Sequence, residues 1–170
     1  MNTETDKIVQ FTILYNRYKK KLYNFLLKLS GDDMIAEDIV QSVFLKFYEN
    51  LESLRNLESA NFWLFRSARN EYYTYYNRNK RKKDLDETFI ANKKDEFELE
   101  TFLELKEIKK IVLLELNKME DEQKEVYLLK EYGGLSYKEI AETMNIDVDL
   151  VKSRLYKVRQ KLINKISKLV

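Results

Sequence analysis

Hydrophobic residues in the last third of the chain recur at helical spacing in two segments. Ser136 followed three residues later by Glu139 is the pattern of a capping box, which starts a helix. Asn145 tolerates the left-handed conformation that reverses a chain, and Asp147 is suited to cap a following helix. That helix carries an apolar stripe of Val151, Leu155, Val158, Leu162 and Ile166. The pattern therefore predicts a helix-turn-helix between Ser136 and Lys161.

Two amphipathic patterns occupy the beginning of the chain. The first ends at Ser30 and Gly31, and Asp32 with Asp33 can cap the second. The second has an apolar stripe of Ile35, Ile39, Val43, Phe44, Phe47 and Leu51. Its opposite face is polar and consists of Glu37, Asp38, Gln41 and Ser42. Most polar helix faces contact only water, so the pattern alone does not favour a binding role for Asp38 and Gln41.

A third helix is predicted after a break in periodicity at residues 52–61, capped by Ser59 or Asn61. The residues expected to pack inward are Leu64, Phe65, Ala68, Tyr72 and Tyr76, with Trp63 anchoring the base. Tyr73 and Tyr75 add two more rings, and five of the six residues from Arg78 to Lys83 are basic. Aromatic rings beside cations are surfaces on which single-stranded bases stack. The alternative is a helix end whose cations interact with its own dipole.

The middle of the chain separates two groups of helices. Residues 84–100 contain seven acidic and two basic side chains without a sustained helical stripe, which predicts an acidic linker. Helical periodicity resumes near Phe102 and stops at Asn117. Another helix is expected from Asp121 to Tyr132, closed by two glycines. We therefore expect an all-α fold with two small helical domains, residues 1–83 and 101–170.

Composition agrees with helices and restricts the chemistry. The chain has no proline, three glycines and 44% apolar residues. It has no cysteine and no histidine, so it lacks thiolate ligands, disulfides and the commonest general base. A hydrolytic or zinc-dependent enzyme is therefore disfavoured, and we expect no catalytic residue, no metal and no cofactor.

Charge is unevenly distributed although the net charge is only +2. Residues 1–83 carry a net +5, residues 84–125 a net −7 and residues 126–170 a net +4. Two basic ends around an acidic middle indicate two surfaces for nucleic acid. Seven basic residues and one acid from Asp149 to Lys168 suit phosphates and base edges in a major groove. The alternative is a solvated helix that only packs beside another helix.

The N-terminal sequence MNTETDKIVQ has no basic segment followed by an apolar core. No apolar run approaches the roughly 18 residues needed to span a bilayer. We therefore expect a cytoplasmic protein without direct membrane insertion.

Three motifs in order carry a family resemblance: AEDIVQSVFLKFY, then FWLFRSARNEYYTYY, then GGLSYKEIAETMNIDVDLVKSRLYKVRQKL. Together they resemble bacterial sigma factors of the sigma-70 family, in the small extracytoplasmic-function (ECF) group that has only regions 2 and 4. The last motif by itself also resembles LuxR-type helix-turn-helix domains. The resemblance implies a factor that binds core RNA polymerase, directs it to promoters and opens DNA at the minus-ten element.

The resemblance also implies site residues. Those implied to dock on the clamp helices of the polymerase beta-prime subunit are Glu37, Asp38, Gln41 and Ser42. Those implied to capture the minus-ten element as single-stranded DNA are Arg55, Asn56, Asn61, Arg66, Arg69, Tyr73, Tyr76 and Arg78. Those implied to contact the minus-thirty-five element are Ser136, Lys152, Ser153, Arg154, Lys157 and Lys161. The beta flap is a further implied polymerase contact, and an anti-sigma factor as partner is left open.

The chain departs from the family pattern at several positions. Many relatives have Leu-Pro where this chain has Met119 and Glu120, glycine in place of Asn145, and threonine in place of Leu150, where a phosphate-binding hydroxyl is lost. Two other functions remain as alternatives. A helix-turn-helix regulator that never joins polymerase would leave the polar face with Asp38 unused, and a helical protein-interaction module would leave the two basic ends unexplained.

Overall fold

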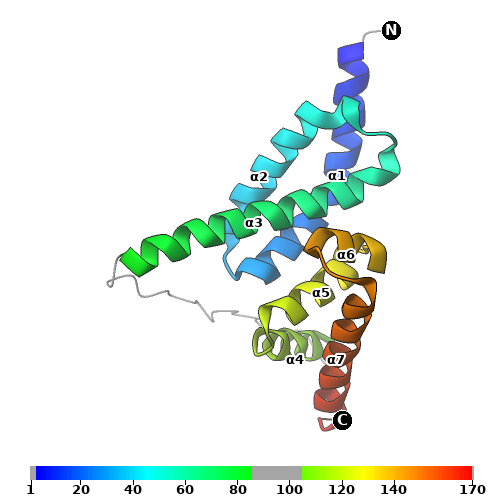
Figure 1. Ribbon diagram of the computed structural model, residues 1–170. Helices are drawn as coiled ribbons and strands as arrows, with labels where there is room; N and C mark the ends of the chain where they lie inside the picture. The colour runs from blue at the N-terminus through cyan, green and yellow to red at the C-terminus, as the bar shows by residue number, and fades with distance from the viewer. Residues whose placement is uncertain (1–2, 86–104, 170) are drawn as a thin grey trace. The chain divides into compact units, whose positions relative to one another are not determined.

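The computed structural model describes residues 3–85 and 105–169, and over those residues it contains helices and turns but no strand (Figure 1). The all-α fold predicted from the sequence is confirmed. The helices fall into two compact units, with α1 to α3 in the first and α4 to α7 in the second. Most of the predicted linker, residues 86–100, and Phe102 lie outside the described residues. Within the described ranges, no helix combines the length and apolar character that a membrane crossing needs.

The first unit contains three long helices, α1 (Thr3–Ser30), α2 (Asp33–Asn50) and α3 (Ala60–Leu85). The turn between α1 and α2 uses Gly31 at a φ of 71°. As predicted, Asp32 caps α2, because its Oδ1 accepts hydrogen bonds from the backbone amides of Met34 and Ile35 at 2.9 and 3.3 Å. Helix α3 packs on both α1 and α2 and continues beyond them at its C-terminal end (Figure 1).

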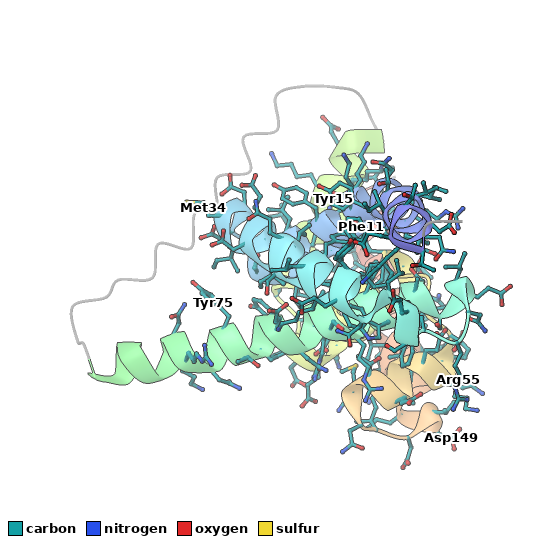
Figure 2. The ribbon with its side chains drawn as sticks, turned by 90° about the horizontal axis from the view of Figure 1, so that it is seen from above. Phe11, Tyr15, Met34, Arg55, Tyr75 and Asp149 are labelled. Carbon is teal, nitrogen blue, oxygen red and sulfur yellow. The ribbon has the colours of Figure 1, made fainter. Side chains whose placement is uncertain are left out.

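Aromatic side chains fill the space between α1 and α2. Phe11 and Tyr15 are labelled on α1 in Figure 2. The Tyr15 ring meets the Phe44 ring edge-on with 4.9 Å between ring centres, and the Phe11 ring meets the Tyr48 ring edge-on at 5.2 Å. The fully buried apolar residues of this core include Leu22, Phe25, Leu26, Phe47, Leu64 and Phe65. The core thus fixes the rotation of α2 and α3 and determines which of their faces remain outside.

One expectation for the third helix was wrong. Tyr76 does not pack inward but is 43% exposed. Figure 1 shows the C-terminal part of α3 continuing beyond α1 and α2, where fewer neighbours cover it. Ser59, one of the two predicted caps, directly precedes the first residue of α3 and so holds the N-cap position. Two short 3-10 turns, η1 (Leu51–Ser53) and η2 (Leu57–Ser59), precede α3, and Asn56 accepts a hydrogen bond from the Ser59 amide at 2.9 Å. The helix also continues through the predicted start of the linker to Leu85.

The second unit consists of α4 (Leu105–Asn117), α5 (Asp121–Glu131), α6 (Tyr137–Met144) and α7 (Val148–Ser167). The predicted capping box is present, with reciprocal hydrogen bonds between Ser136 and Glu139 at 3.0 and 3.1 Å. Asn145 ends α6 in the left-handed conformation, with φ 54° and ψ 51°. Asp147 occupies the N-cap position of α7 as expected, although its side chain makes no capping hydrogen bond.

The stripe predicted on α7 packs into the core of the second unit. Val151, Leu155, Val158 and Leu162 are buried, whereas Ile166 near the end of the helix is half-buried. The helix packs against α4, α5 and α6. This packing fixes the face of α7 that points to solvent, which is the face available to DNA in a helix-turn-helix.

Candidate functional site

The outer face of α2 combines the predicted docking residues with two exposed apolar side chains. Glu37, Asp38 and Gln41 are exposed, as a docking role requires. Met34 and Leu45 lie four residues before Asp38 and four after Gln41, on the same face, and are 71% and 63% exposed. Exposed apolar side chains beside a few polar groups are typical of protein interfaces. Sequence reasoning missed Met34 and Leu45, although their spacing from Asp38 and Gln41 could have indicated them.

Ser42 differs from the other three candidates on α2. It is half-buried, and its hydroxyl donates a hydrogen bond to Glu71 of α3. The same carboxylate oxygen of Glu71 accepts a hydrogen bond from Lys46 at 2.9 Å. The structure therefore turns Ser42 toward α3, away from the face that Asp38 and Gln41 share.

One face of α3 carries both aromatic rings and arginines. The spacing of four, three, four and three residues places the following side chains in one row: Phe62, Arg66, Arg69, Tyr73 and Tyr76. The Arg66 guanidinium lies 5.7 Å from the Phe62 ring centre, and the Arg69 guanidinium lies 4.5 Å from the Tyr73 ring centre. At the rise of an α-helix this row is roughly 20 Å long. Rings and cations in one line suit the stacking and charge of single-stranded nucleic acid.

The other candidates of this group are spread along the first unit. Arg55 is exposed in the turn between η1 and η2 (Figure 2). Asn56 uses its side-chain oxygen to cap η2, and Asn61 is half-buried in the first turn of α3. Arg78 is exposed on the part of α3 that continues beyond α1 and α2. Asn61 and Arg78 are roughly 25 Å apart along the helix, so the structure does not gather these residues at one point.

The solvent face of α7 presents most of the remaining candidates. Lys152, Ser153, Lys157 and Lys161 are exposed. Tyr156, three residues after Ser153, is 65% exposed on the same face and was missed by sequence reasoning. The sequence did contain a signal for Tyr156, because it is an aromatic residue on the charged face of a basic helix. Ser136 is exposed at the start of α6 and is engaged in the capping box.

Several cations of α7 are held by α5. Arg154 donates to Glu122 at 2.7 Å, Arg159 to Glu131 at 3.0 Å, and Lys161 to Gln123 at 3.3 Å. The hydrogen bond to Glu131 raises the pKa of the Arg159 guanidinium. Lys152 instead approaches the ring of Tyr137 on α6, with its ammonium 5.8 Å from the ring centre. Among the described residues no group of acidic side chains is arranged to hold a metal ion.

Comparison with known proteins connects these surfaces to a family. The family model described as Sigma-70 region 2 matches residues 14–82, and the model described as Sigma-70, region 4 matches residues 109–162. The ECF RNA polymerase sigma-E factor of Haemophilus influenzae is 30% identical over 170 residues, which span 94% of this chain and 89% of that protein. The chain belongs to the ECF group of the sigma-70 family.

Other sigma factors are similar over most of this sigma factor's length. ECF sigma factor SigM of Bacillus subtilis is 30% identical over 149 residues, spanning 88% of this chain and 90% of SigM. Sigma factor RpoE from Bartonella quintana was solved in complex with the anti-sigma factor NepR. Its sequence is 27% identical to this chain, and its structure matches with a TM-score of 0.70. It covers 92% of this chain and 96% of the RpoE chain. CnrH shows the same fold, with 20% identity and a TM-score of 0.61. The match covers 93% of this chain and 88% of CnrH.

The matched ranges contain every candidate of this sigma factor. The α2 face, the turn with Arg55 and the α3 row lie inside the region 2 match, and Ser136 and the candidates on α7 lie inside the region 4 match. The α3 row and the solvent face of α7 therefore lie in the ranges matched by two different family models, region 2 and region 4.

Proposed function

We propose that this sigma factor binds core RNA polymerase through the outer face of α2, directs the enzyme to promoters, and opens DNA at the minus-ten element. The observation that carries the proposal is the outer face of α2, where Asp38 and Gln41 lie between exposed Met34 and Leu45. A regulator that only bound DNA would have no use for this face. Its proposed partner is the clamp-helix region of the beta-prime subunit, and the beta flap is the proposed partner of the second unit.

The α3 row is the proposed surface for the opened minus-ten strand. Its rings can stack on unpaired bases, and Arg66 and Arg69 supply charge for the phosphates. Arg55, Asn56 and Asn61 precede the row, and Arg78 follows it, so a single strand could run along the helix from one end to the other. Stacking is worth about 1–3 kcal/mol per base, which offsets part of the cost of opening a base pair.

Helix α7 is the proposed contact for the minus-thirty-five element. Its N-terminal half presents Lys152, Ser153, Tyr156 and Lys157 to solvent, which suits base edges in the major groove. Lys161 lies farther along the helix, where a recognition helix passes the sugar-phosphate backbone. Ser136, at the start of α6, is a proposed phosphate contact, and its hydroxyl accepts a hydrogen bond from the Glu139 amide.

The proposed role is non-enzymatic, because polymerase performs the nucleotide transfer, and its place of action is the cytoplasm, where promoter DNA is transcribed. An anti-sigma factor is a proposed further partner. The Bartonella quintana relative, which was solved with an anti-sigma factor, supports this assignment.

The test is run-off transcription with purified core polymerase, the full chain and a library of genomic fragments. The expected result is a discrete set of transcripts that require both the chain and core polymerase, and co-purification of the two. Fragment binding without polymerase association would replace the proposal with a regulator that acts alone. Polymerase association without selected transcripts would leave only the docking role of α2.

A further inference from the structure

Arg154 is placed differently from its neighbours on the recognition helix. Its Nη2 donates to Glu122 Oε2 at 2.7 Å, and only 18% of its side chain is exposed, whereas the Glu122 side chain is 66% exposed. Glu122 belongs to the first turn of α5, 32 residues away in sequence. By contrast, Lys152, Ser153 and Tyr156 are exposed to solvent. Arg154 therefore points sideways toward α5, at the edge of the face that would meet DNA.

This placement conflicts with direct base contact by Arg154. An arginine that recognises guanine uses two parallel N–H groups of its planar guanidinium, which must be directed at the base edge. A charge-assisted hydrogen bond of 2.7 Å is at the short end of its range, and it orients the guanidinium toward the carboxylate. Contact with a base would require Arg154 to leave both Glu122 and the surface that covers most of its side chain.

The pair also lies where it can orient the helix. Arg159 with Glu131 and Lys161 with Gln123 also link α7 to α5, and both pairs lie farther toward the C-terminal end of α7. Of these three cations, Arg154 therefore lies nearest the N-terminal half of α7, which is the half proposed to meet DNA. The buried neighbours Val151 and Leu155 hold the helix in the core, and apolar contacts alone allow small rotations more readily than a directional ion pair does.

We propose that Arg154 is a positioning residue, which acts on promoter recognition through its ion pair with Glu122 and not by touching bases. The pair fixes the angle at which α7 presents Ser153 and Tyr156 to the major groove. This inference rests on the proposed function of α7 at the minus-thirty-five element. It assigns Glu122, a residue outside the helix-turn-helix, to the same recognition task.

The test exchanges the two charges. Three variants of the full chain are compared with the parent in polymerase holoenzyme: Arg154→Glu, Glu122→Arg, and the double exchange. For each, the affinity for the preferred upstream element is divided by the affinity for a scrambled one. Each single variant should lose about threefold to tenfold of this preference, the range expected when an ordered side chain is released. The double exchange should return to within about twofold of the parent, because the pair is restored with opposite polarity.

Asp121→Arg is the matched control, because it makes the same charge change in the same turn of α5 and should leave the preference unchanged. If the double exchange remains as defective as Arg154→Glu, Arg154 contacts DNA itself and the inference is overturned. If a charge reversal prevents folding, a double-mutant cycle of Glu122→Ala and Arg154→Ala replaces it. Losses of preference that do not add in the double variant support the pair, and losses that add refute it. If the parent holoenzyme shows no preference for any upstream element over a scrambled one, the proposed function of α7 is wrong, and this inference falls with it.

Discussion

The hydroxyl of Ser42 on α2 donates a hydrogen bond to the Glu71 carboxylate on α3, 29 residues away in sequence. Lys46 donates to the same oxygen at 2.9 Å, while the other oxygen, Oε2, is buried and accepts no hydrogen bond. The helix that carries the proposed polymerase face is thus linked to the helix that carries the proposed single-strand surface. A carboxylate with one unsatisfied buried oxygen depends strongly on its remaining partners.

Ser42→Ala should lower the free energy of unfolding of the first unit by about 1–3 kcal/mol, because it removes a hydrogen bond to a charged group. The measurement is urea unfolding followed by fluorescence of Trp63, the single tryptophan, which packs against Phe47 in this unit. Ser53→Ala is the control, since its hydroxyl donates to the nearby Asn50 carbonyl on the surface. Equal losses in both variants would mean that the link to Glu71 contributes nothing of its own.

The double variant Asp38→Ala and Gln41→Ala should abolish assembly with core polymerase while leaving helicity unchanged. Both side chains are exposed, and an interface charge pair broken on one side costs about 2–5 kcal/mol. Affinity is measured by titrating labelled core polymerase, and helicity by circular dichroism. The control is the double variant Asp6→Ala and Gln10→Ala, which removes the same two side-chain types from exposed positions of α1. This variant should bind core polymerase with the affinity of the parent. Unchanged affinity of the α2 variant would show that polymerase docks elsewhere.

Ser136→Ala should destabilise α6 by about 0.5–2 kcal/mol, because it removes the hydroxyl that accepts the Glu139 amide hydrogen. Amide hydrogen exchange of α6 in the full chain measures the loss. Ser136→Thr keeps the capping oxygen and should retain most of the protection. If Ser136→Ala exchanges as slowly as the parent, the capping box has no energetic role in the helix-turn-helix.

Lys161→Ala should weaken holoenzyme binding to preferred and scrambled upstream elements by the same factor. A lysine on the phosphate backbone carries no sequence information, and its loss should reduce the slope of log affinity against log salt by about 0.9. Titrations at two or more salt concentrations give both quantities. Lys109→Ala, an exposed position on α4, is the control for loss of one positive charge. A selective loss on the preferred element would place Lys161 at a base.

Lys118→Met should raise the pKa of Glu115 toward its ordinary value of 4.5. The hydrogen bond from Lys118, at 3.0 Å, is the main cause of the lowered pKa in the parent, and Lys165 at 3.6 Å adds to it. A carboxyl whose folded pKa is lowered contributes stability above about pH 4.5 and loses it as pH falls through the lower value. NMR titration of the Glu115 side chain measures the shift. Lys168→Met, in the same surface hollow, should leave this pKa nearly unchanged.

Features set by neighbouring residues were predictable from the sequence. The Ser136 capping box, the left-handed Asn145 and the apolar stripe of α7 each depend on residues within a few positions of one another. The exposed positions of Asp38 and Gln41 also followed from helical spacing. These expectations succeeded because short-range hydrogen bonds and periodic burial act in the same direction here.

Features that join distant helices could not be predicted in this way. The partners Ser42 with Glu71 and Arg154 with Glu122 are 29 and 32 residues apart, and no local spacing relates them. The exposure of Tyr76 depends on where α1 and α2 end beside α3, which the sequence of α3 alone does not contain. Asn56 was assigned to DNA by resemblance, and its capping hydrogen bond appeared only when the turn was folded.

The left-handed turns determine which residue types the chain can accept at its helix junctions. In the part of the chain that the structure describes, positive φ values occur at Gly31, Gly134 and Asn145. An added Cβ at either glycine would meet no atom within 4 Å, so only the backbone torsion restricts these two positions. Asparagine already satisfies that torsion at position 145. Glycine and asparagine can therefore replace each other at these helix junctions without repacking of the core. A difference between two related sequences at such a position does not indicate a different fold.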